Sequence, residues 1–450
     1  MTEHTNQVNL TELANCRLSS IGKPVVILLA LAVGGIAVAW INCQFVDDAG
    51  HKFFQAYLVA FAFVLSISLG SLFFVLIQHL MRAGWAVVVR RLAEIFCLNL
   101  LVVGILFLPI AWSVWQGDGM VYSWSKKHDA QSESHGHAFD SDDSNVILVS
   151  HLIAQEPTVE HGHADHSEGH LPTKPYLNNT RFLVTWLVLF AIWIALAVFY
   201  FRTSTAQDKT SDYRSTLRME WWSGIATILF GFSLTFGAFD LLMSLDPAWF
   251  STIFGVYYFA GCVVSGLATL LLVVLTFNKL KLVPNVFSEE LQRDLGRLLF
   301  AFVFFWAYIG FSQYMLLWYA NMPETTGWLV KRGMSTATGY TNSWGWLAIF
   351  LLIAHFILPF CGFMSRHVKS NSKAMAFWAV WLLVVHYLDL YWIVIPQSND
   401  GLTISFIEIG TVVSVVAVYG MAALWIASRT NLFAVGDPRM SESLTRQAMY

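Results

Sequence analysis

Long apolar runs alternate with short polar stretches along the whole chain. Each run is long enough to cross about 30 Å of hydrocarbon as a helix, which rises about 1.5 Å per residue. Trp and Tyr gather at the ends of the runs, as in an interfacial belt. The pattern predicts an all-α membrane protein with about ten transmembrane helices. The runs cover residues 24–44, 54–79, 91–114, 181–201, 221–244, 253–277, 297–319, 344–365, 374–395 and 404–427.

The distribution of Lys and Arg predicts how these helices are oriented. If the N-terminus is inside, 19 of the 26 Lys and Arg residues fall on the cytoplasmic side. Because positive residues are enriched on that side, we expect both termini inside and an even number of spans. The predicted segments are a cytoplasmic N-terminal segment (1–23), spans one to three (24–115), an outer loop (116–180), spans four to ten (181–427) and a cytoplasmic tail (428–450).

Composition supports the membrane prediction and removes several kinds of site. Of the 450 residues, 56% are hydrophobic and only 12% are charged, whereas soluble domains carry about 25% charged residues. Membrane lipid is therefore the expected surrounding. The five cysteines are scattered and form no CxxC pair, which argues against a c-type haem, an iron–sulfur cluster or a zinc ribbon on this chain. Without a basic stripe, we expect no nucleic-acid partner.

The predicted outer loop, residues 116–180, is rich in histidine. It holds eight of the fourteen histidines, with Asp and Glu interspersed. One hypothesis is that it binds zinc, copper or nickel. The alternative, which we favour, is a solvated loop with a biased composition, because no spacing fixes a tetrahedral site. The weak metal candidates are His135, His137, His161 and His163.

Ionisable residues inside the predicted spans form a graded series. Counting along the helices places His355 about 16 Å and His386 about 14 Å below the outer face. Asp389 lies one turn nearer that face on the same side of the helix as His386, and Asp240 and Glu408 lie about 6 Å below it. Such residues are costly in lipid and indicate function. The series suits a proton route or a quinol site that opens outward, since quinol oxidation releases two protons.

Other interpretations of the same residues stay open. His355 and His386 lie at matching depth on consecutive spans, so they could ligate a b-type haem. Asp240 or Glu408, taken alone, is as well explained by structural hydrogen bonding. A transporter would also line a cavity with such groups, but we find no clear inverted repeat with broken helices.

Three stretches are more specific than composition or depth. They are FGAFDLLMSLDP (236–247) with WFST (249–252), WAYIGFSQYMLLWYANMPE (306–324) and GDPRMSESL (436–444). These stretches resemble the membrane subunits of bacterial alternative complex III. Together with the ten spans, the resemblance covers nearly the whole chain except the His-rich loop.

The resemblance implies a fold and a set of partners. Members of this NrfD-like, polysulfide-reductase-like family have two four-helix bundles, spans two to five and six to nine, flanked by spans one and ten. The sequence of these stretches is more similar to the ActF-like subunit than to its ActC-like paralogue. The implied partners are that paralogue and subunits that carry iron–sulfur clusters and c-type haems. The resemblance thus implies no haem, iron–sulfur cluster or covalently bound cofactor on this chain, and quinone or quinol as its ligand.

The predicted function is therefore that of a subunit of a respiratory quinol:electron-acceptor (cytochrome c) oxidoreductase in the bacterial cytoplasmic membrane. This chain would contribute a quinol site, an outward-facing proton pathway, or both. The alternatives are a mainly structural or proton-conducting paralogue without bound quinol, and a solute or ion transporter. The candidate residues are Asp240, His386, Asp389, Glu408 and His355 for protons or the quinol head group, and Tyr308, Gln313 and Tyr314 for a ring carbonyl.

Overall fold

The computed structural model describes residues 13–14, 16–18, 22–46, 48–126, 176–284, 286–334, 342–399, 401–403 and 405–448. Most of the predicted outer loop, including the weak metal candidates His135, His137, His161 and His163, lies outside the described residues. The main helices are α2 (Gly22–Cys43), α3 (Ala49–Leu80), α4 (Val87–Leu98), α5 (Leu100–Leu106), α6 (Leu108–Gln116), α8 (Asn179–Thr210), α9 (Tyr213–Leu241), α10 (Phe254–Leu280), α11 (Glu289–Ala320), α12 (Pro323–Lys331), α13 (Ser343–Leu351), α14 (Leu358–Met364), α15 (Arg366–Ser370), α16 (Ser372–Val394), α17 (Phe406–Arg429) and α18 (Met440–Ala448).

Short helical turns complete these elements. The 3₁₀ turns are η1 (Gly84–Ala86), η2 (Ser123–Ser125), η4 (Met243–Leu245) and η6 (Ile395–Gln397), and the segment η5 (Leu352–Ile357) is a π-helix between α13 and α14.

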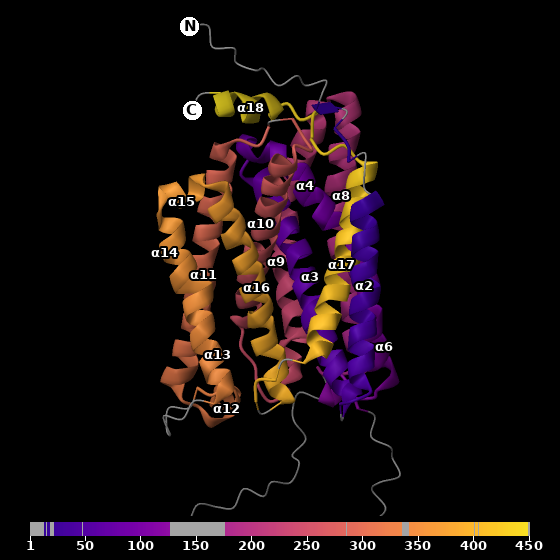
Figure 1. Ribbon diagram of the computed structural model, residues 1–450, viewed down its shortest axis with the longest axis vertical. Coiled ribbons are helices and arrows are strands. Elements are labelled where there is room, and N and C mark those ends of the chain that lie inside the picture. The colour runs from indigo at the N-terminus through magenta and orange to yellow at the C-terminus, as the bar shows by residue number, and fades with distance from the viewer. Residues whose placement is uncertain are drawn as a thin grey trace, which may run out of the picture.

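The prediction of an all-α multi-pass membrane protein is confirmed. The described residues form ten helical segments long and apolar enough to cross a membrane, and they contain no strand. The helices run roughly parallel to one long axis (Figure 1). The first described residues lie against the segment that leads to α18, where the N–H of Leu432 donates to the carbonyl of Cys16 at 3.0 Å, so both ends of the described chain, called the termini below, lie at one end of the molecule. Which end faces the cytoplasm stays a prediction from the Lys and Arg distribution.

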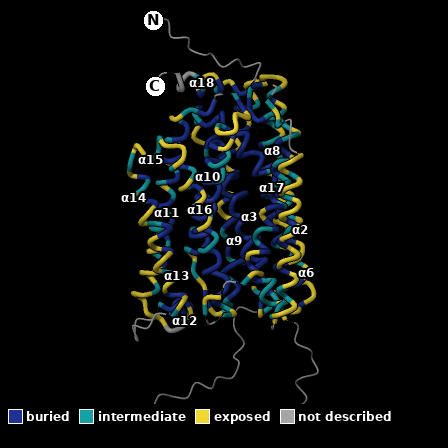
Figure 2. The backbone as a smooth tube through the Cα atoms, viewed as in Figure 1, coloured by how far each residue is buried: buried dark blue, intermediate teal, exposed yellow. Residues whose placement is uncertain are grey.

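The spans form two four-helix groups, as predicted. One contains α3, the α4–α6 span, α8 and α9, and the other contains α10, α11, the α13–α14 span and α16. Helices α2 and α17 pack on each other and, through α17, against α3. Within its most apolar window α3 is 89% buried and α2 only 17%, a contrast visible in Figure 2. Helix α3 is therefore the core of the molecule, and α2 lies at its lipid-facing edge.

The two groups meet where α3 crosses α10 with the two helix backbones in direct contact. A Cβ on Gly70 would lie 1.8 Å from the carbonyl oxygen of Cys262, and one on Gly266 would lie 2.8 Å from the carbonyl carbon of Gly70. Only glycine permits such an approach of two backbones, as at other membrane helix interfaces. The crossing brings side chains of α3 within reach of α16.

The eighth span is not a regular α-helix. Its middle, η5, is a π-helix, and Pro359 follows at the start of α14. Proline has no N–H to donate to the turn before it, and single π-turns are typical of functional positions in helices. His355 lies in this π-helix and is fully buried.

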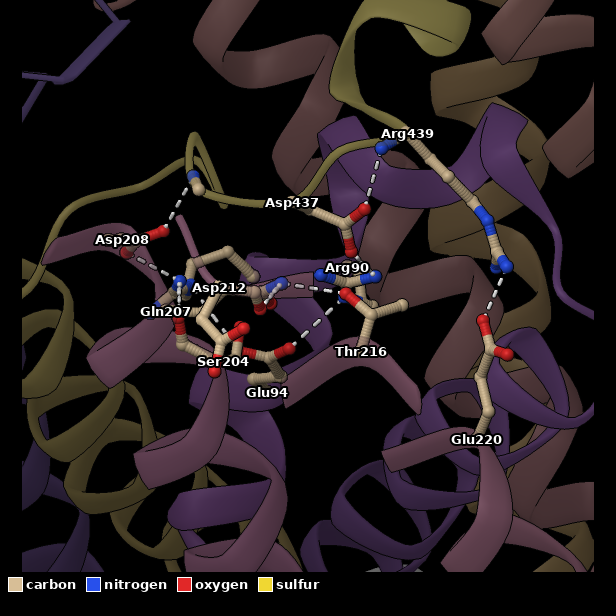
Figure 3. A network of polar contacts seen from close by, with 12 residues as sticks. Arg90, Glu94, Ser204, Gln207, Asp208, Asp212, Thr216, Glu220, Asp437 and Arg439 are labelled. Atoms are coloured by element: carbon tan, nitrogen blue, oxygen red, sulfur yellow. Dashed lines mark hydrogen bonds and ion pairs between the residues drawn. The ribbon is translucent and has the colours of Figure 1, made fainter. Parts of the chain in front are cut away.

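At the end near the termini, a network of buried ion pairs joins α4, α8 and the C-terminal tail (Figure 3). Arg90 binds Asp437 at 2.7 Å and Glu94 at 3.3 Å. Arg91 binds Asp208 at 2.7 Å and Glu94 at 3.3 Å. All five of these side chains are buried or nearly so. The tail is thus fixed to the helix ends by charge.

Candidate functional site

A second buried polar cluster lies where α10, α11, η5 and α16 meet. Helix α16 supplies His386 and Asp389, three residues apart and therefore on one side of the helix. Asp389 lies five residues, or about 8 Å, before the last residue of α16. Both side chains are at most 2% exposed.

Asp389 accepts hydrogen bonds on both carboxyl oxygens. The hydroxyl of Tyr257 on α10 donates to Oδ1 at 2.5 Å, and the indole N–H of Trp306 on α11 donates to Oδ2 at 3.2 Å. Two donors and no described cation surround the group. A carboxyl that accepts at both oxygens is arranged as the ionised form, which is acceptor-only. Asp389 is therefore set up to take a proton.

His386 joins this cluster to the crossing of α3 and α10. Its Nε2 lies 3.0 Å from the hydroxyl of Ser66, which is itself 3.0 Å from the hydroxyl of Ser265. The ring fits because α10 has Gly261 opposite it: a Cβ there would lie 2.6 Å from Cε1 of His386. Nδ1 has no hydrogen-bond partner among the described residues.

His355 is the least satisfied polar group of the cluster. Its ring lies 3.9 Å, between centroids, from the indole of Trp306 and 6.4 Å from the imidazole of His386. Neither ring nitrogen has a partner among the described residues. Because buried polar atoms are nearly always hydrogen-bonded, such a group indicates a place for water or for an exchangeable proton.

A cavity of about 520 Å³ opens beside Asp389. Its size and its mainly apolar, aromatic wall are those of a small-molecule site. Gln313 and Tyr314 line it, and the side-chain oxygen of Gln313 is buried without a described partner. Small residues of α11 and α13 leave the space open. The wall also includes Tyr257, Trp306, Ala307, Gly310, Phe311, Trp328, Leu329, Gly333, Gly345, Ala348, Leu352, Trp392 and Ile393.

The structure brings together five of the eight residues predicted from sequence. His355, His386 and Asp389 form the cluster, and Gln313 and Tyr314 line the adjoining cavity. Tyr308 lies on the outside of α11 with 58% of its surface exposed. Sequence analysis missed Tyr257, and it noted Trp306 only as part of the 306–324 stretch, because the role of both residues depends on which helices pack together.

Asp240 belongs to a different contact in the other four-helix group. It forms an ion pair with Arg181 at 2.6 Å and accepts a hydrogen bond from the hydroxyl of Tyr176 at 3.0 Å. The guanidinium of Arg181 also stacks over the Tyr176 ring at 3.6 Å. Burial raises the pKa of the Tyr176 phenol, so the hydroxyl stays protonated as the donor. This contact fixes the chain where it enters α8.

Glu408 caps its own helix. Its carboxylate accepts from the backbone N–H of Ser405 at 2.8 Å, while the Ser405 hydroxyl accepts from the N–H of Ile407 at 3.2 Å. This reciprocal arrangement is a capping box at the start of α17. Glu408 is not among the residues that line the cavity.

The described packing does not suit a b-type haem between His355 and His386. A macrocycle would need a planar slot between the two rings. Instead, the indole of Trp306 covers His355, and Ser66 and Gly261 are packed against His386. Within the described ranges, no group of three or more His, Cys, Asp or Glu side chains is placed to hold a metal ion.

Comparison with known proteins adds no relative to this picture. No protein-family model matches the chain, and no curated protein matches it. The likeness to alternative complex III therefore stays a prediction from the three stretches of sequence.

Proposed function

We propose that this chain is an ActF-like membrane subunit of a respiratory quinol:electron-acceptor oxidoreductase in the bacterial cytoplasmic membrane. It holds the quinol head group in the cavity beside Asp389. Its partners are an ActC-like paralogue and subunits with iron–sulfur clusters and c-type haems. The observation that carries the proposal is a buried carboxylate, held only by neutral donors, on the wall of an apolar cavity.

The cavity supports a ligand with an apolar body and a polar ring edge. Aromatic and aliphatic side chains make up most of its wall, which suits a flat ring and an apolar tail. Asp389 supplies an acceptor for one hydroxyl, and Gln313 supplies an amide at another part of the wall. The same groups would hold a quinol hydroxyl and a quinone carbonyl in turn, because an amide both donates and accepts.

The chemistry requires places for protons and electrons. Oxidation of a quinol breaks two O–H bonds and yields a quinone, two protons and two electrons. Asp389 takes the first proton as a general base, releases it to water through the outward-facing pathway proposed for this chain, and then takes the second. The electrons pass to an iron–sulfur centre or haem of a partner subunit, since no redox centre is assigned to this chain.

Replacing Asp389 tests this proposal in the assembled complex. Asp389→Asn keeps the size but removes the base: its amide oxygen can still accept from the indole of Trp306, and its NH2 can donate to the hydroxyl oxygen of Tyr257. Quinol oxidation should fall on the order of a hundredfold, the usual contribution of a positioned base, while the subunit composition of the purified complex is unchanged.

Asp212→Asn is the matched control. Asp212 is exposed and caps α9 through a hydrogen bond to the backbone N–H of Arg214, a role that Asn fills equally well. Turnover should match the wild type. Normal quinol oxidation by an intact Asp389→Asn complex would contradict the proposal that this chain binds quinol beside Asp389.

A second candidate function has its own support. The hydrogen-bonded series His386–Ser66–Ser265 crosses between the two four-helix groups and favours a proton-conducting subunit without bound quinol. The two are separated by measuring quinol binding to this chain directly: a chain that binds no quinol, in a complex that loses proton release with His386→Ala, supports conduction. Solute uptake by vesicles containing this chain alone would instead support a transporter.

A further inference from the structure

Arg332 is a buried cation directly behind the cavity wall. It follows α12 and has no exposed surface. Its guanidinium donates to three backbone carbonyls, those of Trp328 at 3.0 Å, Trp392 at 3.3 Å and Ile393 at 2.7 Å. All three of these residues line the cavity, as do Leu329 and Gly333 on either side of Arg332 in the chain.

Among the described residues, no close carboxylate balances the positive charge of Arg332. No described acidic side chain lies within ion-pair distance of it, and Asp246, the nearest acidic influence, is paired with Lys331 at 3.6 Å. Burial lowers the pKa of Arg332 to about 9, an effect that Asp246 opposes. The guanidinium is therefore still protonated at neutral pH.

Aromatic rings hold this cation in place. The guanidinium lies 3.6 Å from the ring centroid of Trp328 and 5.5 Å from that of Trp392. Trp249 stacks on Trp328 at 4.4 Å, with ring planes 13° apart, so the Trp328 ring lies between a cation and an indole. Cation–π contacts of this kind stabilise a buried charge but do not neutralise it. Its field extends into the apolar cavity, where screening by water is weak.

We propose that Arg332 makes the cavity prefer ligands whose head group carries negative charge, and that it stabilises the anion formed when a quinol gives up a proton. This inference rests on the quinol site proposed above. Asp389 is the one charged side chain among the described residues that line the cavity; once it has taken the proton it is neutral, whereas Arg332 behind the wall keeps its charge. Fixed charge aimed at developing charge is an effective form of stabilisation in a dry site.

Two ring compounds of nearly equal size test the inference. One is a 2-hydroxy-3-alkyl-1,4-naphthoquinone, whose acidic hydroxyl is ionised at neutral pH, and the other is its neutral 2-methoxy counterpart. Both are titrated into the full chain in lipid nanodiscs, with binding followed by quenching of tryptophan fluorescence. The chain with Asp389→Asn should prefer the ionised compound by about tenfold or more, the scale of one poorly screened charge.

Variants of Arg332 in the same Asp389→Asn background then assign the preference. Arg332→Gln should remove this preference and leave the affinity for the neutral methoxy compound nearly unchanged, because charge complementarity acts on the charged ligand. Arg332→Lys keeps the positive charge and should retain most of the preference for the ionised compound. Helical content and unfolding temperature are checked for each variant.

Each outcome bears on one claim. Equal loss of both compounds in a folded Arg332→Gln chain, or loss of the preference in folded Arg332→Lys, assigns Arg332 a purely structural role and overturns the inference. Equal affinity for the two compounds before Arg332 is changed also overturns it, with the quinol site intact. If neither compound binds even the wild-type chain, the proposed function itself fails.

Discussion

Two of the buried polar regions of this protein have their hydrogen-bonding and charged groups satisfied in opposite ways. Near the termini, Arg90 and Arg91 each bind two carboxylates, so every charge in that network faces an opposite charge (Figure 3). In the other half, Asp389 is held by a phenol and an indole, and His355 has no described partner. A cavity adjoins the second region.

This difference separates a structural cluster from a candidate site. Paired charges in a low-dielectric interior hold helices together. Removing one partner strongly destabilises the fold, because the other charge is then buried without a counter-charge. A carboxylate with neutral donors can gain or lose a proton without stranding a counter-charge. The comparison therefore predicts that substitutions near the termini affect stability and that substitutions around Asp389 affect ligand chemistry.

The largest effect on stability should come from Arg91→Leu. The substitution leaves Asp208 without its ion-pair partner and leaves Glu94 with Arg90 alone. Leaving a buried charge without its partner costs about 3–5 kcal/mol. We expect a strongly lowered unfolding temperature and a poor yield of folded chain, measured by thermal unfolding in detergent.

Arg297→Leu is the matched control for that change. Arg297 pairs with Glu290 at 3.7 Å, but its side chain is 54% exposed, and such pairs contribute about 0–1 kcal/mol. If the two Arg→Leu variants lose equal stability, the network near the termini is not the structural element that we describe.

A smaller effect, on ligand binding rather than on folding, is expected from Ala348→Phe. Ala348 lines the cavity, and a ring placed there would occupy part of the space for a quinol. We expect the affinity for a naphthoquinone to fall by about tenfold or more, or about 1.4 kcal/mol. The unfolding temperature should stay the same or rise, because an apolar void is filled.

Val380→Phe adds a ring at a position on α16 that is 48% exposed and should leave binding unchanged. Full affinity in Ala348→Phe would show that ligands do not use this cavity. A binding loss in both variants would show that bulk on these helices acts indirectly.

The smallest effect should follow Ser405→Ala. This change removes the hydroxyl half of the capping box at α17 and should cost about 1 kcal/mol of stability, while Ser405→Thr keeps the cap. Quinol oxidation should be normal in both variants. A large loss of turnover from Ser405→Ala would return Glu408 to the candidate site.

The sequence predicted the spans well because lipid imposes length and apolarity on each helix separately. It also placed His386 and Asp389 on one side of α16, since three-residue spacing is a property of a single helix. Helix α11 begins at Glu289, eight residues before the apolar run at 297. Its cap, Ser288, accepts from the N–H of Leu291, a signal that hydropathy does not carry.

The depth of a residue below the outer face could not separate Asp389, which lines the cavity, from Asp240 and Glu408, which have structural contacts. Ser405 and Glu408 have the S-x-x-E spacing of a capping box, which reads directly from sequence. Arg181 and Asp240 lie near the same end of two antiparallel spans, so their pairing was also within reach. Tyr257 and Trp306 were not, because their contacts with Asp389 depend on the packing of α10 and α11 against α16.

The π-helix η5 allows the two halves of the eighth span to face different surroundings. Each residue of an α-helix turns the chain by about 100°. The extra residue in a π-turn therefore changes the direction in which all the following side chains of the span face. Deleting one residue from Leu352–Ile357 would restore a continuous helix but rotate α13 against α14. The cavity wall around Ala348 and the buried face around Phe363 could then no longer both point inward.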